Sequence, residues 1–221
     1  MTDADQPRIS LLGTDAVLFD VGGALFNEIV QQKVWAVCDE LLALDWVREA
    51  APGMNNFTVV YDDRRTEPGN ITETLTALWS RATPKAGTGR VVDAPTIYGG
   101  ETGDELAALA ERTGLSVEDT VRLHAGATYS VAVVGAMPGF VYLSGLDSRL
   151  AWGRHATPRP NAPEGSVMIG ATQAGIMPCA APTGWHIIGL TALKLFDASR
   201  PEPATLRPGD QLRFVIEDIR A

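Results

Sequence analysis

A short segment some way before the midpoint of the chain divides the sequence into two parts with different hydrophobic patterns. Residues 81–90, RATPKAGTGR, contain one proline, two glycines and three basic side chains, with almost nothing apolar to bury. A segment of this composition is typical of an exposed connection between domains. We therefore predict two domains, one at residues 1–88 and one at residues 89–221.

The part before this connection alternates short strands with amphipathic helices. Apolar residues spaced three and four apart predict helices at 30–44 and 71–79, the first with Asn27 as its N-cap. Short apolar runs bounded by turn residues predict strands at 9–12, 17–19, 47–50 and 57–61. Because the apolar stripe of such a helix needs a sheet to cover, the pattern favours a small α/β domain.

The part after the connection has a β-rich pattern. A strand at 91–98 and helices at 103–112 and 116–125 come first, with Gly114 ending one helix and Ser116 capping the next. Long loops rich in glycine and proline then separate short β-type runs at 128–134, 166–169, 185–196 and 211–216. Since the helical crossovers that parallel strands require are missing, we expect an open or closed β-barrel. The predicted fold class is α+β, a small α/β domain followed by a β-barrel domain.

Charge and hydropathy exclude several classes of function. A net charge of -9 and a pI near 4.8 disfavour a nucleic-acid-binding protein, which needs clustered basic side chains. No apolar run approaches the roughly 20 residues of a membrane span, and the first ten residues lack the apolar core of a signal peptide. Cys38 and Cys179 lie far apart, which gives neither a disulfide framework nor a paired metal spacing. We expect a reduced, cytoplasmic protein without a nucleic-acid or membrane partner.

The sequence lacks the common catalytic signatures. It contains no P-loop, no H-E-x-x-H, no C-x-x-C and no G-x-S-x-G. Any nucleotide chemistry must therefore occur on another chain or at an unusual site. Imidazole is the side chain that titrates near neutrality, so His124, His155 and His186 are the candidate acids and bases. Their spacing matches no metal site, and His124 also suits a structural role late in a helix.

The loops between Gly135 and Thr191 are typical of a binding mouth. Within them, a basic island contains Arg149, Arg154, His155 and Arg159 in an otherwise acidic chain. Because guanidinium groups bind carboxylates and phosphates bidentately, we expect Arg154 and Arg159 to hold an anionic group. The alternative is a set of arginines that are solvated or paired with the chain's own acids.

Other residues of these loops suit an amide-like ligand. Gln173 presents one donor beside one acceptor, as an amide or a lactam does. Gly139, Phe140 and Tyr142 combine a close-approach turn, an aromatic ring and a hydroxyl, although a hairpin with packed aromatics explains them equally. Trp185 either walls a pocket or plugs the end of the barrel.

The order of these motifs resembles that of the B-type subunits of 5-oxoprolinase, a family that is similar to allophanate hydrolase subunit 1 and to the KipI-type inhibitor of a sporulation histidine kinase. The residues that carry the resemblance are PGMNN at 52–56, YGG at 98–100, LH at 123–124, PGF at 138–140, YL at 142–143, the Arg154 to Arg159 stretch, GSV at 165–167, Gln173, GW at 184–185, LFD at 195–197 and LRPGD at 206–210. The resemblance extends from Leu11 to Ile216.

The resemblance implies both a fold and a working assembly. It implies a C-terminal barrel of the cyclophilin-like type behind an N-terminal α/β domain. It also implies a complex with two further chains, a C-type subunit, which is KipA-like, and a larger A-type subunit. Such a complex opens 5-oxoproline, or a related lactam or amide, to the amino acid and consumes ATP, which this chain does not necessarily bind itself.

Several positions depart from the pattern of the family. Ala136 and Val141 stand where an aromatic residue and a proline are usual, and Ala174 and Met177 replace a threonine and a tyrosine. Thr183 replaces a glycine, and His186 replaces a common glutamine. Because these positions lie in the presumed pocket, they indicate an altered substrate choice or a non-catalytic role.

Two alternatives stand beside the role in an ATP-dependent hydrolase complex. One is the carboxyltransferase part of a biotin-dependent urea- or amide-carboxylating system, which requires a biotinylated carrier. The other is a KipI-like regulator that binds a kinase without catalysis. Carboxyl transfer with such a carrier identifies the first alternative, and a neighbouring kinase reading frame, in place of one for a C-type homologue, favours the second.

Overall fold

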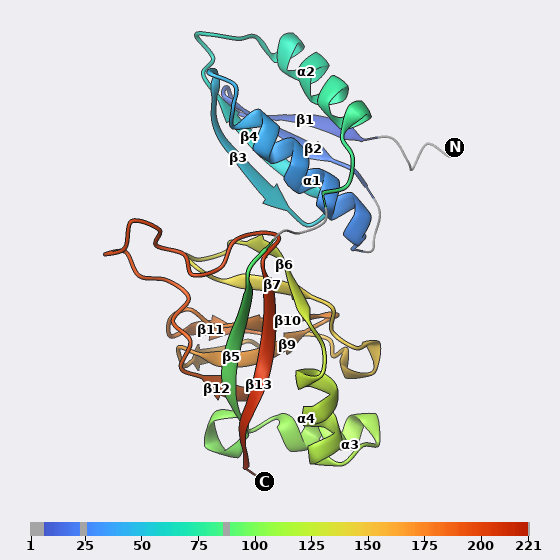
Figure 1. The fold of residues 1–221 in the computed structure, drawn as a ribbon, viewed down its shortest axis with the longest axis vertical. Coiled ribbons are helices and arrows are strands. Elements are labelled where there is room, and N and C mark those ends of the chain that lie inside the picture. The colour runs from blue at the N-terminus through green and yellow to red at the C-terminus, as the bar shows by residue number, and fades with distance from the viewer. Residues whose placement is uncertain (1–6, 23–25, 86–88, 221) are drawn as a thin grey trace. The chain divides into compact units, whose positions relative to one another are not determined.

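The computed structural model describes residues 7–22, 26–85 and 89–220, and the chain divides into two compact units, Met1–Gly87 and Thr88–Ala221 (Figure 1). Residue 88, where the first predicted domain ends, lies outside the described residues. No helix within the described ranges has the length and apolar character that crossing a bilayer requires.

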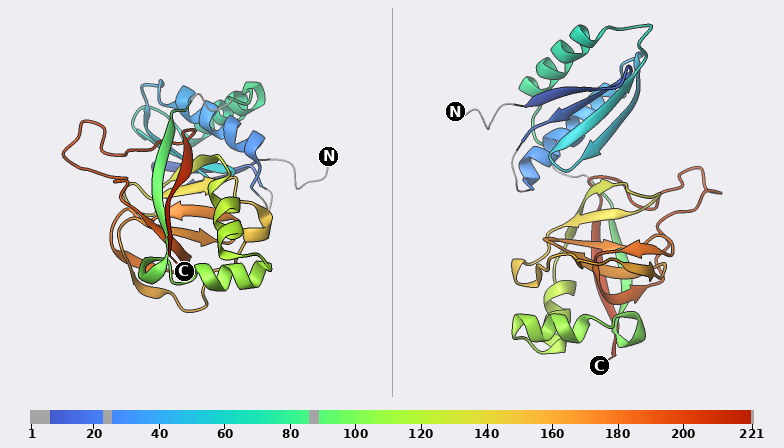
Figure 2. Two further views of the ribbon diagram at one scale, coloured as in Figure 1. Left: turned by 60° about the horizontal axis from the view of Figure 1, so that its bottom comes forward. Right: turned by 180° about the vertical axis from the view of Figure 1, so that it is seen from behind.

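The first unit is a four-stranded antiparallel sheet covered by two helices. Its strands lie in the order β1-β2-β4-β3. Their bounds are β1 Arg8–Leu12, β2 Ala16–Asp20, β3 Val47–Gly53 and β4 Asn56–Tyr61, and the helices are α1 Glu28–Leu41 and α2 Pro68–Arg81. Both helices lie on the same face of the sheet, which Figure 2 shows from behind. The predicted small α/β layer is confirmed.

The core of this unit follows from strand alternation. Val17 and Phe19 on β2, and Phe57 and Val59 on β4, point to the helix side and are fully or almost fully buried. Phe19 and Phe57 face each other across the two strands, with stacked rings 4.8 Å apart. Burial of such side chains contributes about 1.5–3 kcal/mol each, so the packed face holds the sheet and helices together.

A buried amide fixes α1 against the β3–β4 turn. Gln31, which has no exposed surface, donates from Nε2 to the carbonyl oxygen of Gly53 and accepts the backbone N–H of Asn55 at Oε1. Asn55 has a positive φ of 55°, which the hairpin turn requires, and its Oδ1 accepts the N–H of Asn27. Asn27 in turn caps α1, because its Oδ1 accepts the N–H of Val30 at 3.1 Å.

The second unit is a closed seven-stranded barrel in the order β10-β7-β6-β13-β5-β12-β9. The strands are β5 Val91–Gly99, β6 Tyr129–Val134, β7 Val141–Ser144, β9 Ser166–Gly170, β10 Gln173–Ile176, β12 His186–Thr191 and β13 Gln211–Arg220. A separate ribbon pairs β8 Arg159–Ala162 with β11 Ala181–Thr183. The α-helices are α3 Leu106–Thr113 and α4 Val117–Ala125, and two 3-10 turns are η2 Gly100–Thr102 and η3 Ser148–Leu150. The predicted α+β class with a barrel is confirmed.

One pair of barrel strands is parallel. β5 and β13 run side by side from Val91 opposite Gln211 to Gly99 opposite Arg220. Their beginnings are joined through Asp210, whose carboxylate accepts the backbone N–H of Arg90 at 3.2 Å and its guanidinium at 3.0 Å. Because these strands begin and end the unit, the parallel pairing brings together segments at the two ends of its sequence.

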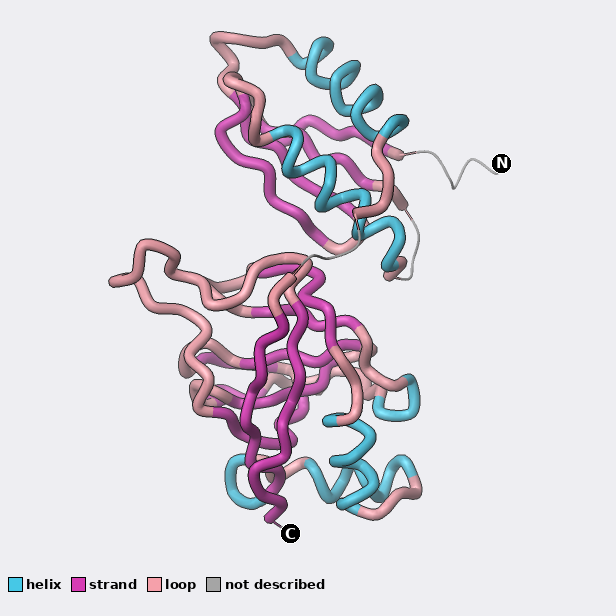
Figure 3. Tube along the Cα trace, in the orientation of Figure 1, coloured by secondary structure: helices cyan, strands magenta, loops and turns pink. Residues whose placement is uncertain are grey.

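Several boundaries differ from the prediction, and two of these differences have a clear structural cause. The helix predicted at 103–112 begins at Leu106, because Gly103 lies directly on β12: a side-chain carbon at Gly103 would be 2.6 Å from the carbonyl oxygen of Ile188. The strand predicted at 185–196 ends at Thr191, beyond which Figure 3 shows a long loop before β13. In that loop the Thr191 hydroxyl accepts the N–H of Leu193 and turns the chain out of the barrel.

Candidate functional site

A largely buried carboxylate lies at the centre of the candidate site. Glu105 stands between η2 and α3, where its backbone N–H donates to the carbonyl oxygen of Ile187 at 3.2 Å. Its Oε2 accepts the N–H of Ile187 at 2.8 Å in return. This reciprocal pair fixes the Glu105 side chain against the first residues of β12.

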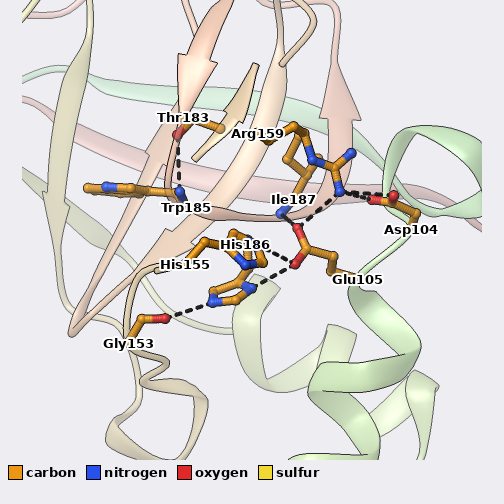
Figure 4. Close-up of polar contacts among 9 residues, drawn as sticks. All are labelled: Asp104, Glu105, Gly153, His155, Arg159, Thr183, Trp185, His186 and Ile187. Carbon is orange, nitrogen blue, oxygen red and sulfur yellow. Dashed lines mark hydrogen bonds and ion pairs between the residues drawn. The ribbon is translucent and has the colours of Figure 1, made fainter. Parts of the chain in front are cut away.

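Two histidines converge on the other oxygen of this carboxylate. Oε1 of Glu105 is 2.7 Å from Nδ1 of His186 and 2.7 Å from Nε2 of His155 (Figure 4). The His186 side chain is buried, while that of His155 is 32% exposed. The site therefore has a fixed inner imidazole and an outer imidazole that a ligand can reach.

The ring of His186 is fixed on all sides. Its Nε2 lies 2.7 Å from the carbonyl oxygen of Gly153, and its plane stacks on the indole of Trp152 at a centroid distance of 3.6 Å. His155 is held through its backbone, since its N–H donates to the carbonyl oxygen of Gly184 at 2.8 Å. The segment around Gly153 and the segment before β12 thus position the two imidazoles together.

The arginines of the basic island have different environments. Arg159 pairs with Asp104 at 2.9 Å and with Oε2 of Glu105 at 3.4 Å. Arg149 pairs with Asp147 at 2.8 Å. Arg154 makes no ion pair with any described residue, and its guanidinium lies 5.5 Å from the centre of the Trp185 ring. The chain's own acids therefore pair with two of the three guanidiniums, and that of Arg154 has no carboxylate partner among the described residues.

The predicted aromatic contacts form a packed cluster beside the barrel core. Phe140, Tyr142 and Trp185 lie with ring centroids 4.9 to 5.9 Å apart, and Phe140 and Trp185 are buried. Trp185 packs flat on glycine backbone: a side-chain carbon at Gly170 would lie 2.3 Å from the indole. Figure 4 shows this indole directed away from the Glu105 carboxylate. Trp185 is thus a packing residue, and its ring also contacts the guanidinium of Arg154.

His124 occupies a different place in the unit. It is fully buried in the aromatic core, with Nδ1 2.8 Å from the hydroxyl of Tyr98 and its ring 4.6 Å from that of Phe214. Burial lowers the pKa of His124 to about 3, which keeps it neutral. The structure brings His155 and His186 together and leaves His124 in the core.

The remaining predicted residues lie on barrel turns. Gln173 opens β10 and is partly buried, and Gly139 has a positive φ of 81° in the β6–β7 turn. A side-chain carbon at Gly139 would lie 3.0 Å from the carbonyl oxygen of Leu195, so this glycine permits the approach of a neighbouring loop. The turn between β6 and β7 therefore explains the presence of Gly139 without a ligand.

Most residues that depart from the family pattern are buried by packing and do not lie on an exposed surface. Val141 and Ala174 are fully buried in the barrel core, and Met177 is buried beside Trp185. The Thr183 hydroxyl accepts the backbone N–H of Trp185 at 3.1 Å. Of these departures, His186 is the one that contacts the Glu105 carboxylate.

Sequence reasoning missed the two acids of the site, Asp104 and Glu105. They lie far from His155 and His186 in the sequence, and only the close packing of Gly103 on β12 brings them near. The glycine-dense segment at 99–103 was the available signal, because glycines directly before a helix mark a close backbone approach.

The glycine-dense segment does not fit ATP. A side-chain carbon at Gly99 would lie 2.0 Å from the carbonyl oxygen of Arg220, and one at Gly103 would lie 2.6 Å from that of Ile188. Neither glycine therefore leaves room for a phosphate. Glu101, Asp104 and Glu105 also place negative charge where phosphate oxygens would lie. The segment therefore does not form a phosphate-binding loop.

Comparisons with known proteins found a matching family model, similar sequences and similar structures. Residues 7–206 match the family described as carboxyltransferase domain, subdomain C and D. The chain is 39% identical to the B-type subunit of 5-oxoprolinase from Escherichia coli O157:H7, over 95% of this chain and 96% of the relative. Among solved structures, TTHA0988 is 29% identical over 93% of this chain with a TM-score of 0.79, and the chain spans 40% of its length.

The fold also occurs in a larger enzyme. The urea carboxylase of Kluyveromyces lactis superposes on 97% of this chain with a TM-score of 0.78, and the chain spans 22% of that protein. At 16% identity this likeness concerns the fold alone.

Proposed function

The chain belongs to the carboxyltransferase-domain family that includes the B-type subunits of 5-oxoprolinase, and from this membership we propose that it is the B-type subunit of such a complex. The observation that carries the proposal is the match to the Escherichia coli relative along nearly the whole of both chains. A match of this extent covers both units of the chain, so the likeness is not confined to one shared module.

We assign the substrate carboxylate to Arg154. Its guanidinium has no carboxylate partner among the residues described and stands over the Trp185 ring. 5-Oxoproline is a small lactam with one carboxylate, and a guanidinium binds that group with two parallel hydrogen bonds. Arg159 keeps a positioning role, because it holds the acids at 104 and 105 in place.

The chemistry at the lactam is assigned to the carboxylate and imidazoles around Glu105. A five-membered lactam is a poor electrophile, and opening it to glutamate requires water to add to the carbonyl carbon and the ring nitrogen to leave with a proton. Polar groups that a ligand can reach, such as His155, suit this part of the substrate.

Other chains complete the assembly in this proposal. ATP makes the lactam carbonyl reactive, and its binding is placed on the partners, since the glycine-dense segment of this chain does not accept phosphate. The partners are a C-type subunit, homologous to KipA, and an A-type subunit. The B-type chain then supplies one half of the substrate site.

The test is the Arg154→Ala variant in the reconstituted complex. Loss of a charge-assisted bidentate contact is worth on the order of 1.5–3 kcal/mol, so KM for 5-oxoproline should rise about tenfold or more. The melting temperature of this chain should not change, because the side chain is exposed. Arg149→Ala is the matched control, since Arg149 is tied to Asp147, and its KM should equal that of the wild type. An unchanged KM for Arg154→Ala would show that the carboxylate binds elsewhere.

A further inference from the structure

The two ring nitrogens of His186 both face oxygen acceptors. Nε2 is 2.7 Å from the carbonyl oxygen of Gly153, which has no hydrogen to donate, so Nε2 carries a hydrogen. In a neutral imidazole Nδ1 then presents a lone pair, and this lone pair points at Oε1 of Glu105, 2.7 Å away. A lone pair and a carboxylate oxygen repel each other. A positively charged species, either a proton or a metal cation, therefore belongs between these two atoms.

A second nitrogen converges on the same point. Nε2 of His155 is also 2.7 Å from Oε1 of Glu105, and the His155 and His186 rings lie 4.0 Å apart. The three potential ligand atoms, one oxygen and two nitrogens, lie within 4.8 Å of one another. Two imidazole nitrogens and one carboxylate oxygen form the donor set of open zinc sites and of related divalent metals.

We propose that Glu105, His155 and His186 form a binding site for a divalent transition-metal ion, with zinc the ion that this donor set favours. Zinc ligands stand about 2.0–2.2 Å from the metal, which separates tetrahedral ligands by roughly 3.4 Å. The two contacts of 2.7 Å must therefore open by well under an ångström. The partly exposed His155 can make that movement, and it leaves the fourth position open to water or to a carbonyl oxygen.

The surroundings of the three ligands are those that orient metal-binding groups. The Gly153 carbonyl fixes the tautomer of His186 that presents Nδ1, and the Trp152 ring fixes its plane. Oε2 of Glu105 is held by the N–H of Ile187, which leaves Oε1 for the ion. Such second-sphere partners raise metal affinity because the ligands need little reorganisation.

The local charge also permits a cation. Arg159 is the nearest positive group, 3.4 Å from the far oxygen of Glu105, but Asp104 pairs with it more closely at 2.9 Å. With neutral imidazoles, Asp104, Glu105 and Arg159 together carry a net charge of about -1. The metal site goes beyond the proposed function and does not depend on it, because metal binding can be measured on this chain alone.

The experiment is a titration of tag-free, chelator-treated protein with ZnCl2 by calorimetry, with Co2+ as a second, coloured probe of the coordination geometry. The wild type should bind one ion per chain with saturation. His155→Ala and His186→Gln should each weaken binding by about 100-fold or more, since loss of a second-sphere partner alone costs 10–100-fold. His155 is partly exposed, so its variant keeps the fold even where the buried His186 variant does not.

The exposed thiol is the control, because Cys179 is the solvent-exposed cysteine among the described residues and a thiolate also binds zinc. Cys179→Ser should bind zinc as the wild type does. The proposal fails if the wild type binds no ion with saturation, if His155→Ala retains the wild-type affinity, or if Cys179→Ser abolishes binding. Each of these outcomes would show that Glu105, His155 and His186 do not form a metal site.

Discussion

Identical side chains have different properties in this molecule, and the histidines show it most clearly. His186 and His155 share a carboxylate near the surface, whereas His124 is enclosed by Tyr98, Tyr129 and Phe214. Nε2 of His124 has no hydrogen-bond partner in the described structure. An imidazole in such a place cannot take up a proton without losing the packing around it.

His124 should make the second unit sensitive to acid. Its pKa falls from 6.5 in the unfolded chain to about 3 in the folded one, so between these values the unfolded chain binds the extra proton. Its contribution is therefore fully present above pH 6.5 and is lost as the pH falls toward 3. The free energy of unfolding should drop by about 2 kcal/mol between roughly pH 8 and pH 5 from this group alone. Urea unfolding of the wild type and of His124→Gln at both pH values measures this difference.

Removal of the titrating group is the control for that prediction. His124→Gln keeps a polar partner for the Tyr98 hydroxyl but binds no proton in this range. The variant should lose about 2 kcal/mol less than the wild type on acidification. Equal acid sensitivity of the two proteins would show that other groups set the pH dependence.

Among the helices and strands, long segments with a periodic apolar pattern were predictable from the sequence, and short segments were not. The stripe from Val30 to Leu44 predicted α1, and Asn27 caps it as expected. Strands β7, β8, β10 and β11 have four residues or fewer, so no alternation identifies them, and the glycines and prolines around them indicated loops instead. Only pairing with neighbouring strands gives these segments a regular structure.

The same limit explains what was predictable of the candidate site. His155, His186, Arg154 and Arg159 stood out because charged and titratable residues in loops are few. Glu105 did not stand out, because acids are common in this chain and its role depends on the contact of one loop with β12. Tertiary contacts between segments far apart in sequence leave no local signal.

Substitution of the buried Gln31 tests how much its hydrogen bonds between α1 and the β3–β4 turn stabilise the first unit. Gln31→Ala removes the side-chain partner that the Gly53 carbonyl and the Asn55 N–H have at the β3–β4 turn. An unsatisfied buried backbone group costs about 1–3 kcal/mol, so thermal or urea unfolding should show a loss of roughly 2 kcal/mol or more. Gln32→Ala, one residue along the same helix and partly exposed, should change stability by less than about 0.5 kcal/mol. Equal effects of the two substitutions would mean that helix propensity, and not the clamp, decides.

The whole molecule consists of two units, each with a hydrophobic core of its own. The first unit contributes a helix-covered sheet and the second a closed barrel that carries the acid and imidazole groups. The α/β pattern before residues 81–90 and the β-rich pattern after them predicted the fold class. The sequence did not predict the parallel β5–β13 pairing, which depends on contacts between the two ends of the unit.

Glutamate release from 5-oxoproline measures whether this chain is a necessary part of a 5-oxoprolinase complex. The assay compares the complete mixture of this chain with its C-type and A-type partners against mixtures that each lack one chain. Glutamate should form with ATP only in the complete mixture. Glutamate formed without this chain, or none formed by a complete mixture whose chains elute as one complex, would show that the chain is not a necessary subunit of a 5-oxoprolinase.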